Sequence, residues 1–119
     1  MLPSTPATAG LLDGDALAAC APRAPALINV GRGDLLSPAG IVRALDAGWL
    51  THYVGDVFVP EPLPADSPLW AHPRCTVTPH NSALTTTDDV VVAFADNLER
   101  YVHGGVEQLK NAFRWSEGY

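Results

Sequence analysis

The chain has 119 residues, of which 47% are hydrophobic and 17% charged, and its formal net charge is −6. This length allows one domain at most, with enough apolar side chains to form a core. Phosphate binding needs grouped Lys and Arg, and the sequence has no basic cluster, so nucleic acid and anionic membrane surfaces are excluded as expected partners. No apolar run approaches the roughly 20 residues that cross a bilayer, and we expect a soluble protein.

The two cysteines, Cys20 and Cys75, stand in no CxxC pair, and no histidine lies at metal-ligand spacing from either. We therefore expect two reduced, partly buried thiols and no metal site. The first residues carry neither the basic nor the apolar stretch of a signal peptide. The expected location is a reducing compartment, with the cytoplasm as the simplest case.

The beginning of the chain predicts a short helix followed by a strand. Residues 13–21 suit a helix, because Asp13 or Asp15 can act as its N-cap residue and a proline follows it. The apolar run at residues 26–30 ends at a glycine and predicts a strand that is buried on both faces.

The middle of the chain predicts a helix between further strands. Ser37 suits the N-cap of a helix and Pro38 its first position, and Gly48 ends the apolar spacing. Residues 51–58 and 75–78 predict two more strands, with a proline-rich loop between them. Short apolar strands that alternate with helices indicate a parallel sheet, and the expected fold is therefore part of a doubly wound α/β domain.

A last helix begins after Thr86 or Thr87 and ends at the glycine pair 104–105. We place the α/β domain at residues 1–105 and regard residues 106–119 as a C-terminal tail of undecided structure. The last helix carries an apolar face with helical spacing. This face consists of Val91, Phe94, Ala95, Leu98, Tyr101 and Val102.

Polar side chains follow each predicted strand at the point where the strand ends. Arg32 follows the first strand, Asp56 and Glu61 follow the core of the second, and His80 follows the third. Ligands of open α/β sheets bind at the carboxyl ends of the strands, so these side chains are expected to converge. A guanidinium matches a carboxylate ligand, an imidazole can act as general acid or base, and a carboxylate beside it would orient the ring.

Each of these side chains also has a plainer interpretation. Arg32 could be an exposed loop residue in a surface ion pair, His80 a hydrogen-bonded residue at a strand end, and Glu61 a solvated loop acid. Asp56 follows a glycine inside a predicted strand, where a charge is costly unless it has a partner.

Four segments of the sequence resemble the D-isomer-specific 2-hydroxyacid dehydrogenases, in the order and spacing of that family. They cover roughly residues 2–103, and the ending EGY resembles the glyoxylate/hydroxypyruvate reductase branch. The resemblance implies that the expected sheet is the second half of a Rossmann-type NAD(P)-binding domain. The four segments are LPSTPAT, ALINVGRGDLL, GDVFVPEPLPADSPLW and VTPHNSALT.

The resemblance also implies a function, which is hydride transfer between NAD or NADP and a small 2-oxoacid or 2-hydroxyacid, in a homodimer. By the resemblance, Arg32 binds the substrate carboxylate and keto oxygen, His80 is the general acid and base, and Glu61 is the partner of His80. The implied cofactor-binding residues are Ser4, Pro6, Val30, Arg32, Asp56, His80 and Ser82.

The sequence departs from the family in two large features. It has no GxGxxG loop, on which the cofactor pyrophosphate would rest, and no substrate domain before it. The residue that selects NAD or NADP is missing with that loop. We therefore expect a dehydrogenase sequence that is truncated or partial at its N-terminus. The alternative is a shortened, non-catalytic module that acts through protein contact.

Overall fold

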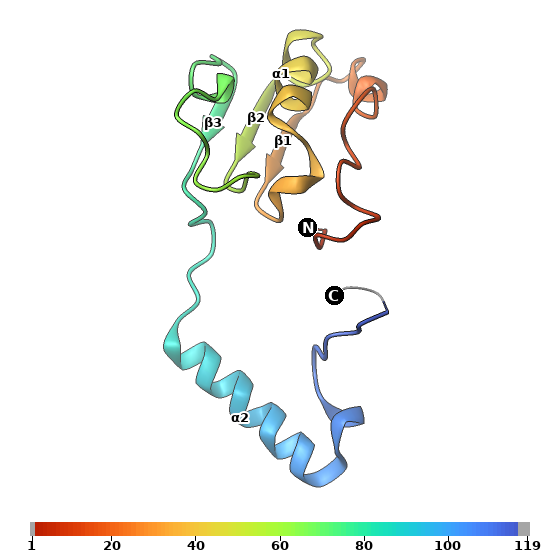
Figure 1. Ribbon diagram of the computed structural model, residues 1–119, viewed down its shortest axis with the longest axis vertical. Helices are drawn as coiled ribbons and strands as arrows, with labels where there is room; N and C mark the ends of the chain where they lie inside the picture. Colours follow the sequence, from red (N-terminus) through yellow and green to blue (C-terminus); the bar gives the residue numbers. More distant parts are fainter. Residues whose placement is uncertain (1, 117–119) are drawn as a thin grey trace. The chain divides into compact units, whose positions relative to one another are not determined.

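Figure 1 shows a computed structural model of the protein, and the structure describes residues 2–116. The chain divides between Ser82 and Ala83 into two compact units, which we call the N-terminal unit and the C-terminal unit. The predicted boundary at residues 105–106 stays a prediction.

The N-terminal unit is built on a three-stranded parallel sheet in the order β1-β2-β3. Its strands are β1 (Ala26–Asn29), β2 (His52–Gly55) and β3 (Cys75–Val77). In register, Leu27 lies beside Tyr53, which in turn lies beside Cys75. The predicted parallel α/β sheet is confirmed.

The longest helix of this unit, α1 (Pro38–Asp46), begins as the sequence predicts. The Ser37 hydroxyl accepts a hydrogen bond from the Gly40 N–H at 3.1 Å, as an N-cap residue should. Asp13 supports this cap, because its Oδ1 accepts hydrogen bonds from the Ser37 N–H at 3.0 Å and from its hydroxyl at 2.7 Å. Helix α1 packs on β2 (Figure 1) and buries Ile41 and Leu45.

The helix predicted at residues 13–21 is wrong. The structure has a series of turns there and one short 3-10 helix, η1 (Ala18–Cys20). Gly14 adopts a φ of +65°, which no α-helix allows at its first turn. The Asp13 carboxylate also binds Ser37 at a distant point of the chain, and is therefore not the cap of its own segment.

The core lies on one side of the sheet, so the prediction that the first strand is buried on both faces is wrong. Asn29 of β1 is buried, whereas Ile28 on the opposite face is 64% exposed and Val30 is 38% exposed. Among the described residues of this unit, helix α1 packs on the core face and leaves Ile28 exposed. The buried apolar side chains of the core are those of Leu17, Leu36, Ile41, Ala44, Leu45, Leu50, Tyr53, Phe58, Leu63 and Leu69.

The C-terminal unit consists of the predicted long helix, α2 (Thr87–Gly104), followed by the short 3-10 helix η4 (Val106–Gln108). Thr86 is the N-cap residue, and its hydroxyl accepts the Asp89 N–H at 3.2 Å. Gly105 ends the helix with a φ of +69°. None of the residues of α2 is buried, so its apolar face is open. Among the residues that the structure describes, no helix has the length and hydrophobicity needed to span a membrane.

Candidate active site

The three strands end at a cleft of about 320 Å³ at the carboxyl edge of the sheet, which we call the edge cleft. The structure brings Arg32, Glu61 and His80 together there, although they follow three different strands. The expected convergence of these side chains is therefore present. The complete lining consists of Ser4, Arg32, Gly33, Asp34, Val57, Phe58, Val59, Glu61 and His80.

His80 and Glu61 form a hydrogen-bonded pair in the edge cleft. His80 Nδ1 lies 2.8 Å from Glu61 Oε2, and the other carboxylate oxygen accepts the Phe58 N–H at 2.8 Å. The hydrogen bond with His80, followed by that with the Phe58 N–H, holds the pKa of Glu61 below its usual range. Glu61 is therefore an anion that orients the imidazole ring, and Nδ1 of the ring carries the hydrogen between them.

The backbone of His80 adopts a φ of +53°, in the left-handed region that few residues other than glycine enter. Such a conformation persists only where neighbouring contacts impose it. The contacts that hold this segment come from Asp56.

Asp56 is only 2% exposed, and its carboxylate binds the segment that carries His80. It accepts hydrogen bonds from the Thr78 hydroxyl, from the Asn81 N–H at 3.0 Å and from the Ser82 N–H at 2.9 Å. The Thr78 hydrogen bond contributes most to holding the pKa of Asp56 far below its usual range, and the backbone N–H groups add to it. Asp56 therefore has the partners that a buried charge requires.

The lowered pKa of Asp56 predicts a pH-dependent stability. Because the folded pKa lies below the unfolded one, Asp56 contributes fully above the ordinary aspartate range, and this contribution is lost as the pH falls towards the folded value. In Asp56→Asn, we expect a lower free energy of unfolding at pH 7 and a smaller further loss on acidification than in the wild type. Urea unfolding from pH 7 to pH 2 measures both quantities.

The exposed loop residue Asp66 offers a matched control for this series. Asp66→Asn also removes one negative charge, and it should leave the pH dependence of unfolding as in the wild type. If the free energy of unfolding fell equally with pH in Asp56→Asn and in the wild type, the carboxylate of Asp56 would not be what holds the 78–82 segment.

Arg32 is exposed at the edge cleft, and two glycines shape the loop that carries it. A Cβ at Gly33 would lie 2.3 Å from the carbonyl carbon of Phe58, so only glycine lets the two loops pack this closely. The Gly31 N–H donates to Asn29 Oδ1 at 3.1 Å. The Arg32 guanidinium donates through Nη1 to the Gly31 carbonyl at 2.9 Å.

The other predicted cofactor-binding residues are more dispersed. Ser4 lines the edge cleft, and its hydroxyl donates to the Asp34 carboxylate. Val30 lines a second, mainly apolar cleft of about 230 Å³ at β1. The Ser82 N–H is bound to Asp56, and Pro6 is exposed and lines neither cleft. The roles of these residues towards a cofactor stay predictions.

Sequence reasoning missed three residues that build this site, namely Asn29, Asp34 and Thr78. Asn29 carried a usable signal, because it is a polar side chain inside the apolar run ALINV. A polar group in a buried strand needs a hydrogen-bond partner and often has a specific task. Thr78 and Asp34 carried no such signal, because threonine is common in strands and aspartate in loops.

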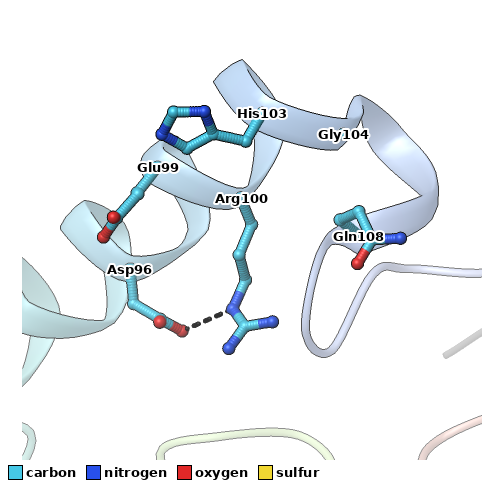
Figure 2. A pocket seen from close by; sticks show the side chains of 6 residues that line it. All are labelled: Asp96, Glu99, Arg100, His103, Gly104 and Gln108. Carbon is cyan, nitrogen blue, oxygen red and sulfur yellow. Dashed lines mark hydrogen bonds and ion pairs between the residues drawn. The ribbon is translucent and has the colours of Figure 1, made fainter.

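The C-terminal unit has a cleft of its own, of about 470 Å³ (Figure 2). Asp96 Oδ2 lies 3.0 Å from Arg100 Nε and 3.1 Å from Lys110 Nζ, so acidic and basic groups pair with one another. Asp96, Arg100 and Lys110 are all partly exposed, and this cleft offers no buried polar group for a ligand. The edge cleft is the better candidate. The lining of the C-terminal cleft is Asp96, Glu99, Arg100, His103, Gly104 and Gln108.

A parallel α/β sheet with a cleft at its carboxyl edge is the arrangement in which doubly wound α/β proteins bind their ligands. The family model "D-isomer specific 2-hydroxyacid dehydrogenase, NAD binding domain" matches residues 1–82, which are the residues of the N-terminal unit. The chain therefore belongs to the D-isomer specific 2-hydroxyacid dehydrogenases. The resemblance of the sequence motifs to this family is confirmed, as is the Rossmann-type fold.

Known members of the family are similar to this chain over most of its length. The glyoxylate/hydroxypyruvate reductase A of Photorhabdus laumondii is 39% identical over 114 residues, which cover 92% of this chain and 36% of the relative. The D-isomer specific 2-hydroxyacid dehydrogenase of Xanthobacter autotrophicus, solved in complex with NADPH and MES, has a TM-score of 0.88 and 35% identity, with coverage of 100% of this chain and 48% of that chain.

A third similar protein is the NADPH-dependent glyoxylate/hydroxypyruvate reductase of Sinorhizobium meliloti, solved in complex with NADP and sulfate. It has a TM-score of 0.84 and 32% identity, with coverage of 100% of this chain and 38% of that chain. This chain thus spans well under two thirds of the length of each of these proteins.

Proposed function

We propose that the protein reduces small 2-oxoacids, such as glyoxylate or hydroxypyruvate, with NADPH or NADH. The observation that carries this proposal is the joint presence of Arg32, Glu61 and His80 in one cleft, with a 2.8 Å hydrogen bond between His80 and Glu61. The names of the similar reductases from Photorhabdus laumondii and Sinorhizobium meliloti support the substrate class.

The cleft residues suit this reaction in distinct roles. The guanidinium of Arg32 binds the substrate carboxylate and polarises the neighbouring carbonyl. The Nδ1 atom of His80 is engaged with Glu61, so Nε2 is the ring nitrogen that can give its proton to the developing alkoxide. Glu61 keeps the ring in this orientation through its hydrogen bond with Nδ1. When bound, the nicotinamide supplies the hydride that C2 of the substrate receives.

The described residues fit the nicotinamide side of NAD(P)H. The apolar cleft that Val30 lines begins at the end of β1, directly before the Arg32 loop, and can receive a flat apolar ring. Asp56 uses both carboxylate oxygens within the protein, so we assign it to the support of the 78–82 segment. Two structures similar to this chain were solved with NADPH or NADP, which favours a nicotinamide cofactor.

The proposal extends to assembly and location. We propose a homodimer, which membership of this family implies, with a small-molecule substrate and neither nucleic acid nor membrane as partner. Cys20 and Cys75 are free and only partly buried, which fits a reducing compartment such as the cytoplasm.

The proposal is tested with the complete gene product that carries this chain. We expect it to oxidise NADPH or NADH in the presence of glyoxylate or hydroxypyruvate, at a kcat in the ordinary range of about 1–1000 per second. Absorbance at the nicotinamide band follows the reaction, and each 2-oxoacid is assayed with each cofactor. A folded, complete product without turnover on any of these pairs would contradict the proposal and would favour a non-catalytic module.

A further inference from the structure

We propose that Asn29 is a positioning residue for Arg32 and that it thereby sets the affinity of the enzyme for the carboxylate of its substrate. The proposal rests on the function proposed above. Asn29 does not itself line the edge cleft, and it acts through the backbone of the loop that carries the arginine.

The burial of Asn29 is the first argument. It is 7% exposed. Among the described residues, the buried polar or charged side chains are those of Asn29 and Asp56. Asn29 occupies the last position of β1, where an apolar residue would pack against the core without any need for partners. A buried amide is costly unless it is hydrogen-bonded, so its contacts should show what it does.

Both polar atoms of the Asn29 side-chain amide form hydrogen bonds with the backbone of the Arg32 loop. Its Nδ2 donates to the Arg32 carbonyl at 2.9 Å, and its Oδ1 accepts the Gly31 N–H at 3.1 Å. The two bonds hold the backbone on both sides of the Arg32 Cα atom, from which the side chain emerges. Aspartate would offer no donor for the carbonyl, and leucine would offer neither a donor nor an acceptor.

Asn29 is itself held by the neighbouring strand. Its backbone carbonyl accepts the Asp56 N–H, which follows β2, at 3.0 Å. Its side chain lines the same cleft as Tyr53 of β2. Burial raises the pKa of the Tyr53 hydroxyl to about 12, although the polar atoms of Asn29 act to lower it. Through these contacts the Arg32 loop is anchored to the sheet.

Positioning matters for Arg32 because a guanidinium grips a carboxylate through two parallel hydrogen bonds. This fork requires the correct approach of the whole group, and a displacement of about 1 Å can cost about 100-fold in rate. Arg32 is exposed, and its guanidinium donates a hydrogen bond to the carbonyl of Gly31 in its own loop. The backbone of this loop, which Asn29 holds, therefore helps to set the direction of the Arg32 side chain.

The test uses Asn29→Ala and Asn29→Asp in the complete gene product. We expect the KM for glyoxylate or hydroxypyruvate to rise about 10- to 100-fold. In a double-mutant cycle, Asn29→Ala should add less than about 3-fold to the loss caused by Arg32→Ala, because the two residues act as one unit. A merely structural residue would lower activity by the same factor in both backgrounds.

Asp13→Ala is the matched control, because Asp13 also makes two side-chain hydrogen bonds to a distant loop, at Ser37. It should lower the melting temperature and leave the KM for the 2-oxoacid unchanged. Tyr53→Phe provides a second variant if the Asn29 variants do not fold. It removes only the Tyr53 hydroxyl, which lines the same cleft as the Asn29 side chain, and should raise the same KM by a smaller factor.

Amide hydrogen exchange separates this proposal from the proposed function. The Gly31 N–H should exchange faster in Asn29→Ala than in the wild type, and at the wild-type rate in Asp13→Ala, whatever the activity of the protein. A wild type without reductase activity overturns the proposed function alone. An unchanged Gly31 exchange rate, an unchanged KM for the 2-oxoacid, or full additivity with Arg32→Ala overturns the role of Asn29.

Discussion

Replacement of Arg32 by alanine in the complete protein is expected to lower kcat/KM for glyoxylate or hydroxypyruvate by about 1000-fold, and to raise KM more than it lowers kcat. Removal of one preorganised donor to a developing oxyanion lowers kcat by about 100- to 1000-fold. Arg32 is assigned the binding of the substrate carboxylate in addition. Its side chain is exposed at the edge cleft, so the loss should come without a loss of folding. Steady-state kinetics with the oxoacid as varied substrate measure the effect.

Arg32→Lys sharpens this prediction. Lysine keeps the positive charge but has no planar fork, so it should recover less than about a tenth of the lost kcat/KM. Arg23→Ala removes an exposed arginine outside the edge cleft and should leave the kinetics unchanged. Wild-type kinetics in Arg32→Ala would place the carboxylate-binding group elsewhere.

The parts of the fold that follow from local chemistry could be predicted from the sequence. Ser37 and Pro38 define the start of α1, because a hydroxyl cap and a proline at the first position satisfy the free N–H groups of a helix. The strands could be located by their apolar runs. The edge cleft could also be anticipated, since parallel strands place the residues that follow them at one edge.

The parts that depend on distant partners could not be predicted. Asp13 resembled the cap of its own segment, but its carboxylate binds Ser37, which lies 24 residues further along the chain. The run 26–30 resembled a fully buried strand, because hydrophobicity alone does not tell which elements cover a face. The need for glycine at position 33 comes from the backbone of Phe58, which lies in a different loop.

The candidate site shows the same division. Arg32, Glu61 and His80 could be named because they follow successive predicted strands and match the motifs of the family. Asp56 was noticed as a costly buried charge, but its partners in the 78–82 segment depend on the path of the chain after β3. A sequence shows which groups can do chemistry more readily than it shows which groups hold them.

His80 should be the second position at which substitution nearly abolishes activity. His80→Gln is expected to lower kcat by about 100- to 10,000-fold, the range that a general acid contributes. Glutamine keeps a polar side chain that can still bind Glu61, so the segment that Asp56 holds should stay folded. Circular dichroism and thermal unfolding check the fold, and kcat at saturating oxoacid measures the chemistry. A kcat within 10-fold of the wild type would remove His80 from the role of proton donor.

Glu61→Gln tests the coupling of the pair through kcat. The Glu61 carboxylate accepts the hydrogen of His80 Nδ1, and this hydrogen bond holds the pKa of Glu61 below its usual range, so that the carboxylate is charged. Glutamine can present either its carbonyl or its amide group to Nδ1, so it no longer fixes which ring nitrogen carries the hydrogen. We expect kcat at saturating oxoacid to fall about 10- to 100-fold, which is part of the roughly 100- to 10,000-fold that a general acid contributes. The control Glu107→Gln, which changes an exposed acid on η4, should leave kcat as in the wild type. An unchanged kcat in Glu61→Gln would mean that Glu61 does not orient the imidazole ring for the reaction.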